Sequence, residues 1–313
     1  DLGIPFGEGP WFMAFGDTFE SEGDFSAGWR SNVLARIPRP AFDTVPLFDW
    51  MADGETPAFA GEILPSRKTE DDEKTVVPTG GFQLGDALYL AYMSVRRWDA
   101  PGMWTCNEAG LAKSTDQGRT WRKLDGPRWP GDSGFAQNAA LVVEDHVHFW
   151  GAPAGRYGPV RLMRVPSDRV EDPDAYAYFL GRDASGEPIY VTGTPAMHQA
   201  VPLVPGPCGE PSAAYCDAIG GFLLAAYSEP RGAVLLRAAP VPEGPYGEPV
   251  ELVGRDFGPM LYGGFLHKDF MEPRGRRIGF ALSQWLPTYN VRWMAAELVV
   301  SEEPDDDSPG GSS

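Results

Sequence analysis

Short apolar and aromatic segments recur along the chain, most of them entered through a tight turn. They are residues 11–16, 87–92, 146–151, 221–227 and 277–282. Each is followed by a second segment, in which an apolar pair leads into a mostly basic or small residue. These segments are residues 33–36, 111–114, 162–165, 235–238 and 293–296. Segments of this length and composition are typical of strands, so the pattern predicts five strand pairs in strict alternation.

Five regular pairs predict a closed, repeated architecture. The repeat is about sixty residues long, somewhat longer than a typical four-stranded propeller blade. No stretch keeps an apolar stripe at helical spacing for three turns without a proline or glycine. A jelly roll or a sandwich would not require such regular pairing. We therefore predict an all-β fold, a five-bladed β-propeller.

Composition supports this fold class and a single domain. The chain contains 38 glycines, 31 prolines and 10 tryptophans, a mixture suited to many turns and aromatic strands. We assign residues 1–300 to one propeller domain. Residues 301–313 are rich in Asp, Gly and Ser, and they predict a flexible, solvated tail.

The formal net charge of −18 narrows the range of partners. A nucleic-acid-binding protein needs a basic face, and docking on anionic lipid needs one as well, so both are disfavoured. No apolar run approaches the length that would insert into a membrane. A neutral glycan or another small uncharged ligand is the better match.

Cysteine and histidine spacing predicts no metal site and no cofactor. Cys208 and Cys216 are close enough in sequence to bridge a hairpin, but two free buried thiols fit equally well. His146 and His148 have the only zinc-like spacing, which a strand explains too. The chain starts on residues that look like the entry to a strand, as a processed secreted protein would. We expect a secreted monomer.

One local motif marks the fold. Residues 114–121 read Ser-x-Asp-x-Gly-x-Thr-Trp, the Asp-box pattern of propeller hairpins in sialidases and other carbohydrate-active proteins. We expect Asp116 to cap amides in the turn, Gly118 to adopt a left-handed conformation, and Trp121 to pack under the blade. The motif marks a propeller and assigns no catalysis.

Two aspartates flank the first aromatic segment, which we take as the innermost strand of the first repeat. Asp1 precedes this segment and Asp17 follows it. A pair of carboxyl groups in one pocket is what glycoside hydrolysis requires, one as nucleophile or base and one as acid. The structural alternatives are a turn residue for Asp17 and a solvated chain end for Asp1.

Further polar and aromatic residues lie at the ends of predicted strands or in Gly- and Pro-rich loops. Tryptophans can stack on sugar faces, and amides, carboxylates and arginine can bind hydroxyl groups. Each also has a structural alternative: blade packing, rim sealing, an inter-blade salt bridge for Arg156, and a hydrogen-bonded structural role for His267. The candidate substrate-binding residues are Trp29, Asn32, Trp104, Gln137, Arg156, Glu210, Tyr262, His267, Gln284 and Trp285.

A set of short motifs, in order along the chain, carries a family resemblance. The motifs are residues 1–3, 15–19, 31–32, 92–96, 153–156, 209–212, 262–265 and 283–285, with Trp98, Pro101, Gly102, Ser114, Thr115, Asp116, Gly118 and Trp121. Together they resemble the actinobacterial endo-D-arabinanases of glycoside hydrolase family 183, formerly a domain of unknown function. The resemblance runs from Asp1 to about Met294.

The resemblance implies a five-bladed propeller that hydrolyses bonds within D-arabinan, the furanose polymer of mycobacterial arabinogalactan and lipoarabinomannan. It also implies retention of anomeric configuration through two aspartates, which map to Asp1 as nucleophile and Asp17 as general acid/base. Pro211 and Lys268 differ from the commonest family members, which bears on subsite specificity more than on chemistry.

Two other functions compete with this one. A sialidase would use the Asp-box, and residues 35–38 faintly resemble its Phe/Tyr-Arg-Ile-Pro motif. However, the aromatic residue of that motif is absent, no arginine triad is evident, and an acidic pocket would repel a sialic-acid carboxylate. The second alternative is a non-catalytic glycan-binding propeller, in which the aspartates only bind hydroxyl groups.

Overall fold

The structure is a computed structural model that describes residues 1–21, 25, 27–52 and 59–299. The predicted tail, residues 301–313, lies outside the described residues. The all-β prediction is confirmed: strands account for nearly all regular structure, and the helical elements are short. The helical elements are the 3₁₀ turns η1 (Ser167–Arg169) and η2 (Pro173–Ala175) and the helix α1 (Thr194–Gln199).

Three hydrogen-bonded sheets are small and consist of consecutive strands. The first sheet contains β1 (Leu2–Phe6), β2 (Trp11–Phe15), β3 (Val33–Ile37) and β4 (Trp50–Met51). The second contains β5 (Thr75–Leu84), β6 (Ala87–Trp98), β7 (Trp104–Ser114) and β8 (Arg122–Pro130). The last contains β18 (Leu261–Met271), β19 (Arg277–Gln284) and β20 (Asn290–Glu297).

The fourth sheet has nine strands and is made of two consecutive runs. One run is β9 (Gln137–Val143), β10 (His146–Ala152), β11 (Gly158–Pro166), β12 (Ala177–Arg182) and β13 (Pro188–Thr192). The other is β14 (Val204–Cys216), β15 (Gly221–Ser228), β16 (Ala233–Ala239) and β17 (Val250–Val253). A short irregular pairing between β11 and β14 joins the runs.

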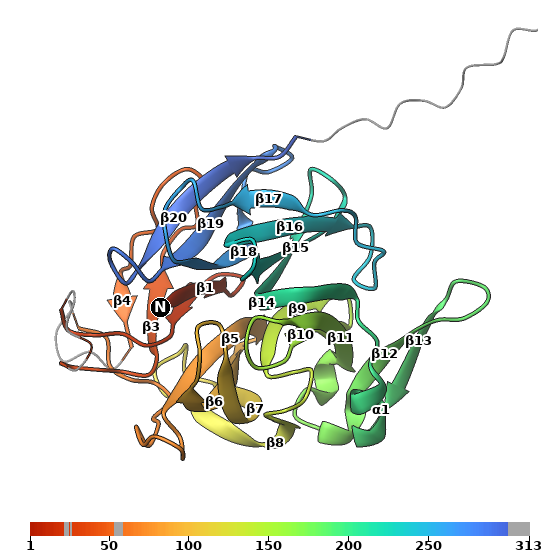
Figure 1. Cartoon of the computed structure of the whole chain (residues 1–313), viewed down its shortest axis with the longest axis horizontal. Coiled ribbons are helices and arrows are strands. Elements are labelled where there is room, and N and C mark those ends of the chain that lie inside the picture. The colour runs from red at the N-terminus through yellow and green to blue at the C-terminus, as the bar shows by residue number, and fades with distance from the viewer. Residues whose placement is uncertain (22–24, 26, 53–58, 300–313) are drawn as a thin grey trace, which may run out of the picture.

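The three small sheets and the two runs of the fourth sheet each contribute their first strand to a closed ring. β1 contacts β5 and β18, β5 contacts β9, β9 contacts β14, and β14 contacts β18. Figure 1 shows the remaining strands extending outward from this centre. The sheets are therefore curled around one axis in a propeller-like arrangement.

The five predicted strand pairs are confirmed as antiparallel neighbours. They are β2 with β3, β6 with β7, β10 with β11, β15 with β16, and β19 with β20. The expectation that residues 11–16 form the innermost strand of the first repeat is wrong. An additional strand precedes each pair and takes the axial position, so residues 11–15 form the second strand of the first sheet.

The Asp-box forms the turn between β7 and β8. Asp116 accepts hydrogen bonds from the backbone N and the side-chain Oγ1 of Thr120, at 2.9 and 2.6 Å. Gly118 has a φ of 82°, and Trp121 packs against the core cluster that contains Phe12 and Leu34 of the first sheet. The turn thus joins neighbouring sheets, in agreement with the expected structural role.

Candidate active site

The β1–β2 hairpin places Asp1 and Asp17 at one end of the axis. Leu2 pairs with Phe15 in this hairpin, so the residue before β1 lies beside the residues after β2. The backbone N of Gly16 donates to the carbonyl of Asp1 at 3.0 Å. The two aspartates therefore come together through antiparallel pairing, and they do not flank one strand as the sequence suggested.

Asp17 is a buried carboxyl group with two side-chain donors. Its Oδ1 accepts hydrogen bonds from Thr75 Oγ1 at 2.6 Å and from Trp29 Nε1 at 2.9 Å. Burial raises the pKa of Asp17 above its usual range, although these two hydrogen bonds oppose the shift. The protonated form is thereby favoured, which suits a group that donates a proton.

Asp1 has a different environment. Tyr262 Oη donates a hydrogen bond to Asp1 Oδ1 at 2.7 Å. Asp1 Oδ2 lies against Gly16, where a Cβ atom would come within 2.6 Å of it. The two aspartates are therefore held by different hydrogen-bond donors.

Arg156 forms an ion-pair centre beside the aspartates. Its Nε donates to Glu210 Oε1 at 2.8 Å, and its Nη1 donates to Glu229 Oε2 at 3.1 Å. The guanidinium group also lies over the rings of Tyr227 and Tyr262, 5.2 and 4.8 Å from their centroids. The inter-blade salt bridge named as the structural alternative for Arg156 is therefore present.

Glu210 has one carboxylate oxygen without a partner. Its Oε2 is buried and accepts no hydrogen bond, and its backbone φ is 43°. Burial raises the pKa of Glu210, while Arg156 opposes that shift. Gln137 holds the surrounding backbone, because its Oε1 accepts from the Glu210 N at 2.9 Å and its Nε2 donates to the carbonyls of Pro153 and Gly155.

These groups line a cavity of about 620 Å³, a size common for ligand sites. Its aromatic lining is Phe19, Phe25, Trp29, Trp98, Trp104, Tyr227, Tyr262, Phe265, Trp285 and Tyr289. Its acidic lining is Asp1, Asp17, Asp99, Glu210 and Glu229, and its basic lining is Lys74 and Arg156. The excess of carboxyl groups favours an uncharged ligand over an anionic one.

Trp104 and its neighbour Trp98 are strand residues and do not lie in a Gly- and Pro-rich loop. Trp98 is the last residue of β6 and Trp104 the first of β7, and the two residues are register partners. Trp98 is exposed and Trp104 is buried, with their rings edge to face at 5.6 Å. Both still line the cavity. Trp285 lies on its rim, exposed, with its ring stacked on Phe25 at 4.9 Å.

Three predicted binding residues, Asn32, Gln284 and His267, do not line this cavity. Asn32 is fully buried, and it bonds the backbone of Leu64 and Val76. Gln284 is also buried, and it accepts a hydrogen bond from Arg292. Their amides are therefore engaged in holding loops and strands together.

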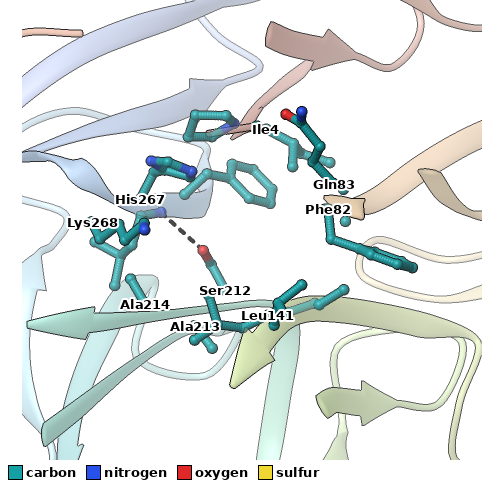
Figure 2. Close-up of a pocket in the computed structure, with 18 of the residues that line it drawn as sticks. Ile4, Phe82, Gln83, Leu141, Ser212, Ala213, Ala214, His267 and Lys268 are labelled. Atoms are coloured by element: carbon teal, nitrogen blue, oxygen red, sulfur yellow. Dashed lines mark hydrogen bonds between the residues drawn. The ribbon is translucent and has the colours of Figure 1, made fainter. Parts of the chain in front are cut away.

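His267 lies at the other end of the axis. Figure 2 shows it beside Lys268 and Ser212 at a second cavity of about 50 Å³. The axial strands begin near the large cavity and run toward this small one. His267 therefore lies at the opposite end of the axial strands from Asp1 and Asp17.

Several site residues escaped the sequence interpretation. Thr75 was not among the candidate residues, yet its hydroxyl donates a hydrogen bond to Asp17. Glu229 follows the predicted strand 221–227, a strand-end position that could have drawn attention to it. Tyr289 lies in a short loop between β19 and β20, and no local pattern distinguishes it.

The remaining expectations concern metals, thiols and membranes. Among residues 1–21, 25, 27–52 and 59–299, no three His, Cys, Asp or Glu side chains form a group suited to a metal ion. Cys106, Cys208 and Cys216 are buried free thiols, the second of the two alternatives left open. No helix in the described part of the chain is long and apolar enough to cross a membrane.

Comparison with known proteins places the chain in a family. Its residues 1–295 match the family described as "Domain of unknown function (DUF4185)", and the chain belongs to that family. The chain is also 29% identical to "Notoamide biosynthesis cluster protein J" of Aspergillus sp. (strain MF297-2), over 93% of this chain and 80% of that protein. The corresponding J' protein of Aspergillus versicolor is 28% identical, over 92% of this chain and 81% of that protein.

Solved structures share the fold at low sequence identity. A putative hydrolase from Bacteroides ovatus has a TM-score of 0.59 and 15% identity, over 90% of this chain and 79% of that one. A GH43_1 enzyme from Xanthomonas citri has a TM-score of 0.55 and 14% identity, over 96% and 88% of the two chains. The RS223 β-xylosidase has a TM-score of 0.54 and 10% identity, over 96% and 93%. The β-propeller-like fold is therefore one that glycosidases use.

Proposed function

We propose that the chain is a five-bladed β-propeller and a retaining glycoside hydrolase that cleaves α-D-arabinofuranosidic bonds within D-arabinan. The proposed substrates are mycobacterial arabinogalactan and lipoarabinomannan, and the proposed family is glycoside hydrolase family 183. The blade count rests on the ring of β1, β5, β9, β14 and β18, because each of these strands begins a separate run of consecutive strands. The substrate rests on the sequence motifs.

One observation carries the proposed chemistry. Asp1 and Asp17 line one large cavity, and each accepts hydrogen bonds from different side chains, Asp1 from Tyr262 and Asp17 from Thr75 and Trp29. Glycoside hydrolysis divides its work between two carboxyl groups in this manner. The fold is shared with a xylosidase and with a GH43_1 enzyme that has been solved in complex with xylotriose.

In the proposed mechanism Asp1 attacks the anomeric carbon while Asp17 protonates the departing glycosidic oxygen. The bond between that carbon and that oxygen breaks, and a glycosyl ester to Asp1 forms. Asp17, now ionised, then removes a proton from water. The water oxygen displaces Asp1, and the sugar leaves with its original configuration. Retention by this route requires the two carboxyl groups to lie about 5–5.5 Å apart.

The cavity lining supports an uncharged polysaccharide. The exposed rings of Trp98 and Trp285 offer apolar faces to sugar rings, and the excess of acidic groups repels anionic chains. This charge also disfavours a sialidase, whose substrate carries a carboxylate. Trp29 serves Asp17 as a donor, so we assign it to positioning the acid. We further propose that the protein acts outside the cell as a monomer.

The test compares wild type with Asp17→Asn on mycobacterial arabinogalactan, with new reducing ends as the readout. We expect the wild type to release oligosaccharides and Asp17→Asn to lose at least 10²-fold of this activity. Asp125→Asn, an exposed carboxyl group on the outer strand β8, is the matched control and should act as wild type.

Two outcomes would count against the proposal. An Asp17→Asn variant with undiminished activity would remove Asp17 from the mechanism. Tight binding of arabinan by the wild type with no new reducing ends would instead support the glycan-binding alternative.

A further inference from the structure

The carboxyl group of Asp17 is bonded to the protein through one oxygen only. Its Oδ1 accepts hydrogen bonds from Thr75 Oγ1 at 2.6 Å and from Trp29 Nε1 at 2.9 Å. Among the described residues, none donates a hydrogen bond to Oδ2. Asp17 lines the large cavity, whereas Thr75 lies behind it and does not. Oδ1 is therefore anchored to the protein, and Oδ2 is the oxygen left for a ligand.

The two donors come from neighbouring sheets, and each is fixed. Thr75 is the first residue of β5 and is fully buried. The ring of Trp29, in the connection between β2 and β3, is stacked on Phe19 with centroids 6.4 Å apart. The ammonium groups of Lys68 and Lys74 lie over the same ring at 5.5 and 5.7 Å from its centroid. Each donor is therefore held in place by contacts other than its bond to Asp17.

These two bonds decide which oxygen of Asp17 can carry a proton. A carbonyl oxygen has two lone pairs, and both of those on Oδ1 are already used. Turning the carboxyl group over would bring an O–H group against Trp29 Nε1, which is a donor only and cannot accept it. Thr75 alone would permit the reversal, because a hydroxyl group can accept as well as donate. Only Oδ2 can therefore carry the proton without breaking one of these bonds.

The amino group of Asp1 does not compete for this carboxyl group. It donates to the backbone carbonyl oxygen of Asp17 at 3.4 Å. Burial lowers the pKa of this amino group to about 5, although the charge of Asp17 opposes the shift. Burial raises the pKa of Asp17, and the two hydrogen bonds and the amino group oppose that rise. Both carboxyl oxygens are thus left to Thr75, Trp29 and the cavity.

We propose that Thr75 and Trp29 are positioning residues that keep the acid proton of Asp17 on Oδ2 and aim it at the glycosidic oxygen. This role rests on the proposed function, because it concerns the same acid. The Oδ2–H bond breaks as the glycosidic oxygen takes the proton and leaves the anomeric carbon with the bonding electron pair. Oδ2 later takes a proton from the attacking water. Neither Thr75 nor Trp29 touches the reacting atoms.

The first test needs no substrate. Infrared difference spectra compare each protein with the same protein carrying Asp17→Asn, at an acid pH where both are folded, which isolates the C=O stretch of protonated Asp17. Accepted hydrogen bonds lower this frequency. Thr75→Val and Trp29→Phe should each raise it, because Oδ1 is the carbonyl oxygen and loses a donor, and Thr75→Ser should restore it. A band that neither variant moves, or no band from Asp17, would overturn the proposal.

The second test separates proton donation from the fold. Thr75→Val should lower kcat on arabinan by about 10- to 10²-fold with little change in KM. On a nitrophenyl glycoside of an α-D-arabinofuranosyl oligosaccharide the loss should be much smaller, because nitrophenolate departs without a proton. Thr75→Ser should recover most of the activity, and Thr192→Val, exposed on β13, should act as wild type. An equal loss on both substrates would overturn the positioning role.

The two tests keep this role distinct from the reaction itself. If the wild type cleaves neither substrate, the proposed reaction fails, and the infrared spectra still decide which oxygen of Asp17 carries the proton. If Thr75→Val does not fold, Trp29→Phe, which keeps an aromatic ring beside Phe19, serves in both tests.

Discussion

Gly16 leaves space for the carboxylate of Asp1. A Cβ atom at this position would lie 2.6 Å from Asp1 Oδ2, closer than non-bonded atoms approach. The nearest atoms belong to a movable side chain and not to backbone, so the fold can absorb a methyl group. The carboxylate, however, would have to leave its position.

Gly16→Ala should therefore impair the chemistry much more than the fold. A displacement of about 1 Å can cost about 10²-fold in rate, whereas the free energy of unfolding should change by less than about 1 kcal/mol. The measurements are kcat/KM on arabinan and urea unfolding. Gly247→Ala, where a Cβ meets only one atom at 3.8 Å, is the control. Wild-type activity in Gly16→Ala would show that the Asp1 position is not critical.

The buried carboxyl group of Asp17 makes stability depend on pH in a defined direction. Its pKa is raised in the folded state by burial, so the native protein binds more protons there than the unfolded chain. Stability is then lost as pH rises from the unfolded pKa, near 3.8, through the folded pKa. The penalty is complete above the folded-state pKa.

Asp17→Asn should remove this penalty, since its Oδ1 can still accept from Thr75 and Trp29. We expect the variant to be more stable than wild type at pH 7. The difference should shrink toward zero below about pH 4. Urea unfolding across this pH range is the measurement. A variant less stable than wild type at pH 7 would contradict the assigned environment.

Local sequence could predict only part of this site. Asp1, Asp17, Tyr262 and Arg156 stand at strand ends or in Gly-rich turns, where polar residues are conspicuous. Asn32, by contrast, has the same polar character, but its amide satisfies backbone groups of other segments. Whether an amide faces a cavity or a neighbouring backbone depends on tertiary pairing, which local pattern does not encode.

The loop between β10 and β11 is tied to its surroundings by one arginine. Arg156 is mostly buried and bonds Glu210 on β14 and Glu229 after β15. Removing one partner from a buried ion pair leaves uncompensated charge, at a cost of about 3–5 kcal/mol. The loop between β10 and β11 is therefore held in position by ion pairs as well as by the backbone pairing of its flanking strands.

Arg156→Met should destabilise the protein by about that amount. Arg156→Lys should be intermediate, because an ammonium group cannot bond both carboxylates with the geometry of a guanidinium group. Chemical denaturation at pH 7 measures both, with Arg119→Met in the exposed Asp-box turn as the control. Equal stability of Arg156→Met and wild type would refute the structural importance of the ion pairs.

The sequences of the axial strands explain why the strand pattern did not predict these strands. Strands that converge on an axis approach one another closely, and small residues permit this. A Cβ at Gly80 would lie 2.3 Å from the carbonyl oxygen of Asn138 on β9. Such strands carry glycine and proline in place of regular apolar alternation, as the sequence of β5 shows. The outer pairs keep the ordinary pattern and were predictable.

The whole molecule closes on itself through its first and last sheets. β1 contacts β18 and β19, and Ser283 Oγ donates to the carbonyl of Leu2 at 2.9 Å. Trp11 Nε1 donates to Asp269 Oδ2 at 2.7 Å across the same junction. In the described part of the chain these two sheets share no strand, and packing and side-chain hydrogen bonds join them.

Trp11→Phe should therefore weaken the ring as a unit. The loss of a donor to a charged acceptor should lower the free energy of unfolding by about 1–3 kcal/mol. The transition should remain single, as expected if closure stabilises all sheets together. Trp98→Phe, at an exposed ring, is the stability control. Early separate melting of one part of the protein would contradict cooperative closure.

At the scale of the whole molecule, the regular repeat of strand pairs was enough to predict a closed all-β fold. It did not predict that two consecutive runs of strands would pair into one nine-stranded sheet. The contact of Gly158 with Cys208 and of Val160 with Val204 joins two runs into one sheet. These positions are far apart in the pattern and have no distinguishing composition. Pairing between runs depends on how the ring closes, which only the assembled structure determines.

The most direct measurement is ¹H NMR of wild-type digestion of mycobacterial arabinogalactan, read at the earliest times together with product chain length. The proposed mechanism predicts oligosaccharides of several sugars whose first-formed reducing ends retain the α configuration. Products that first appear with inverted configuration, or an absence of any new reducing ends, would contradict the account.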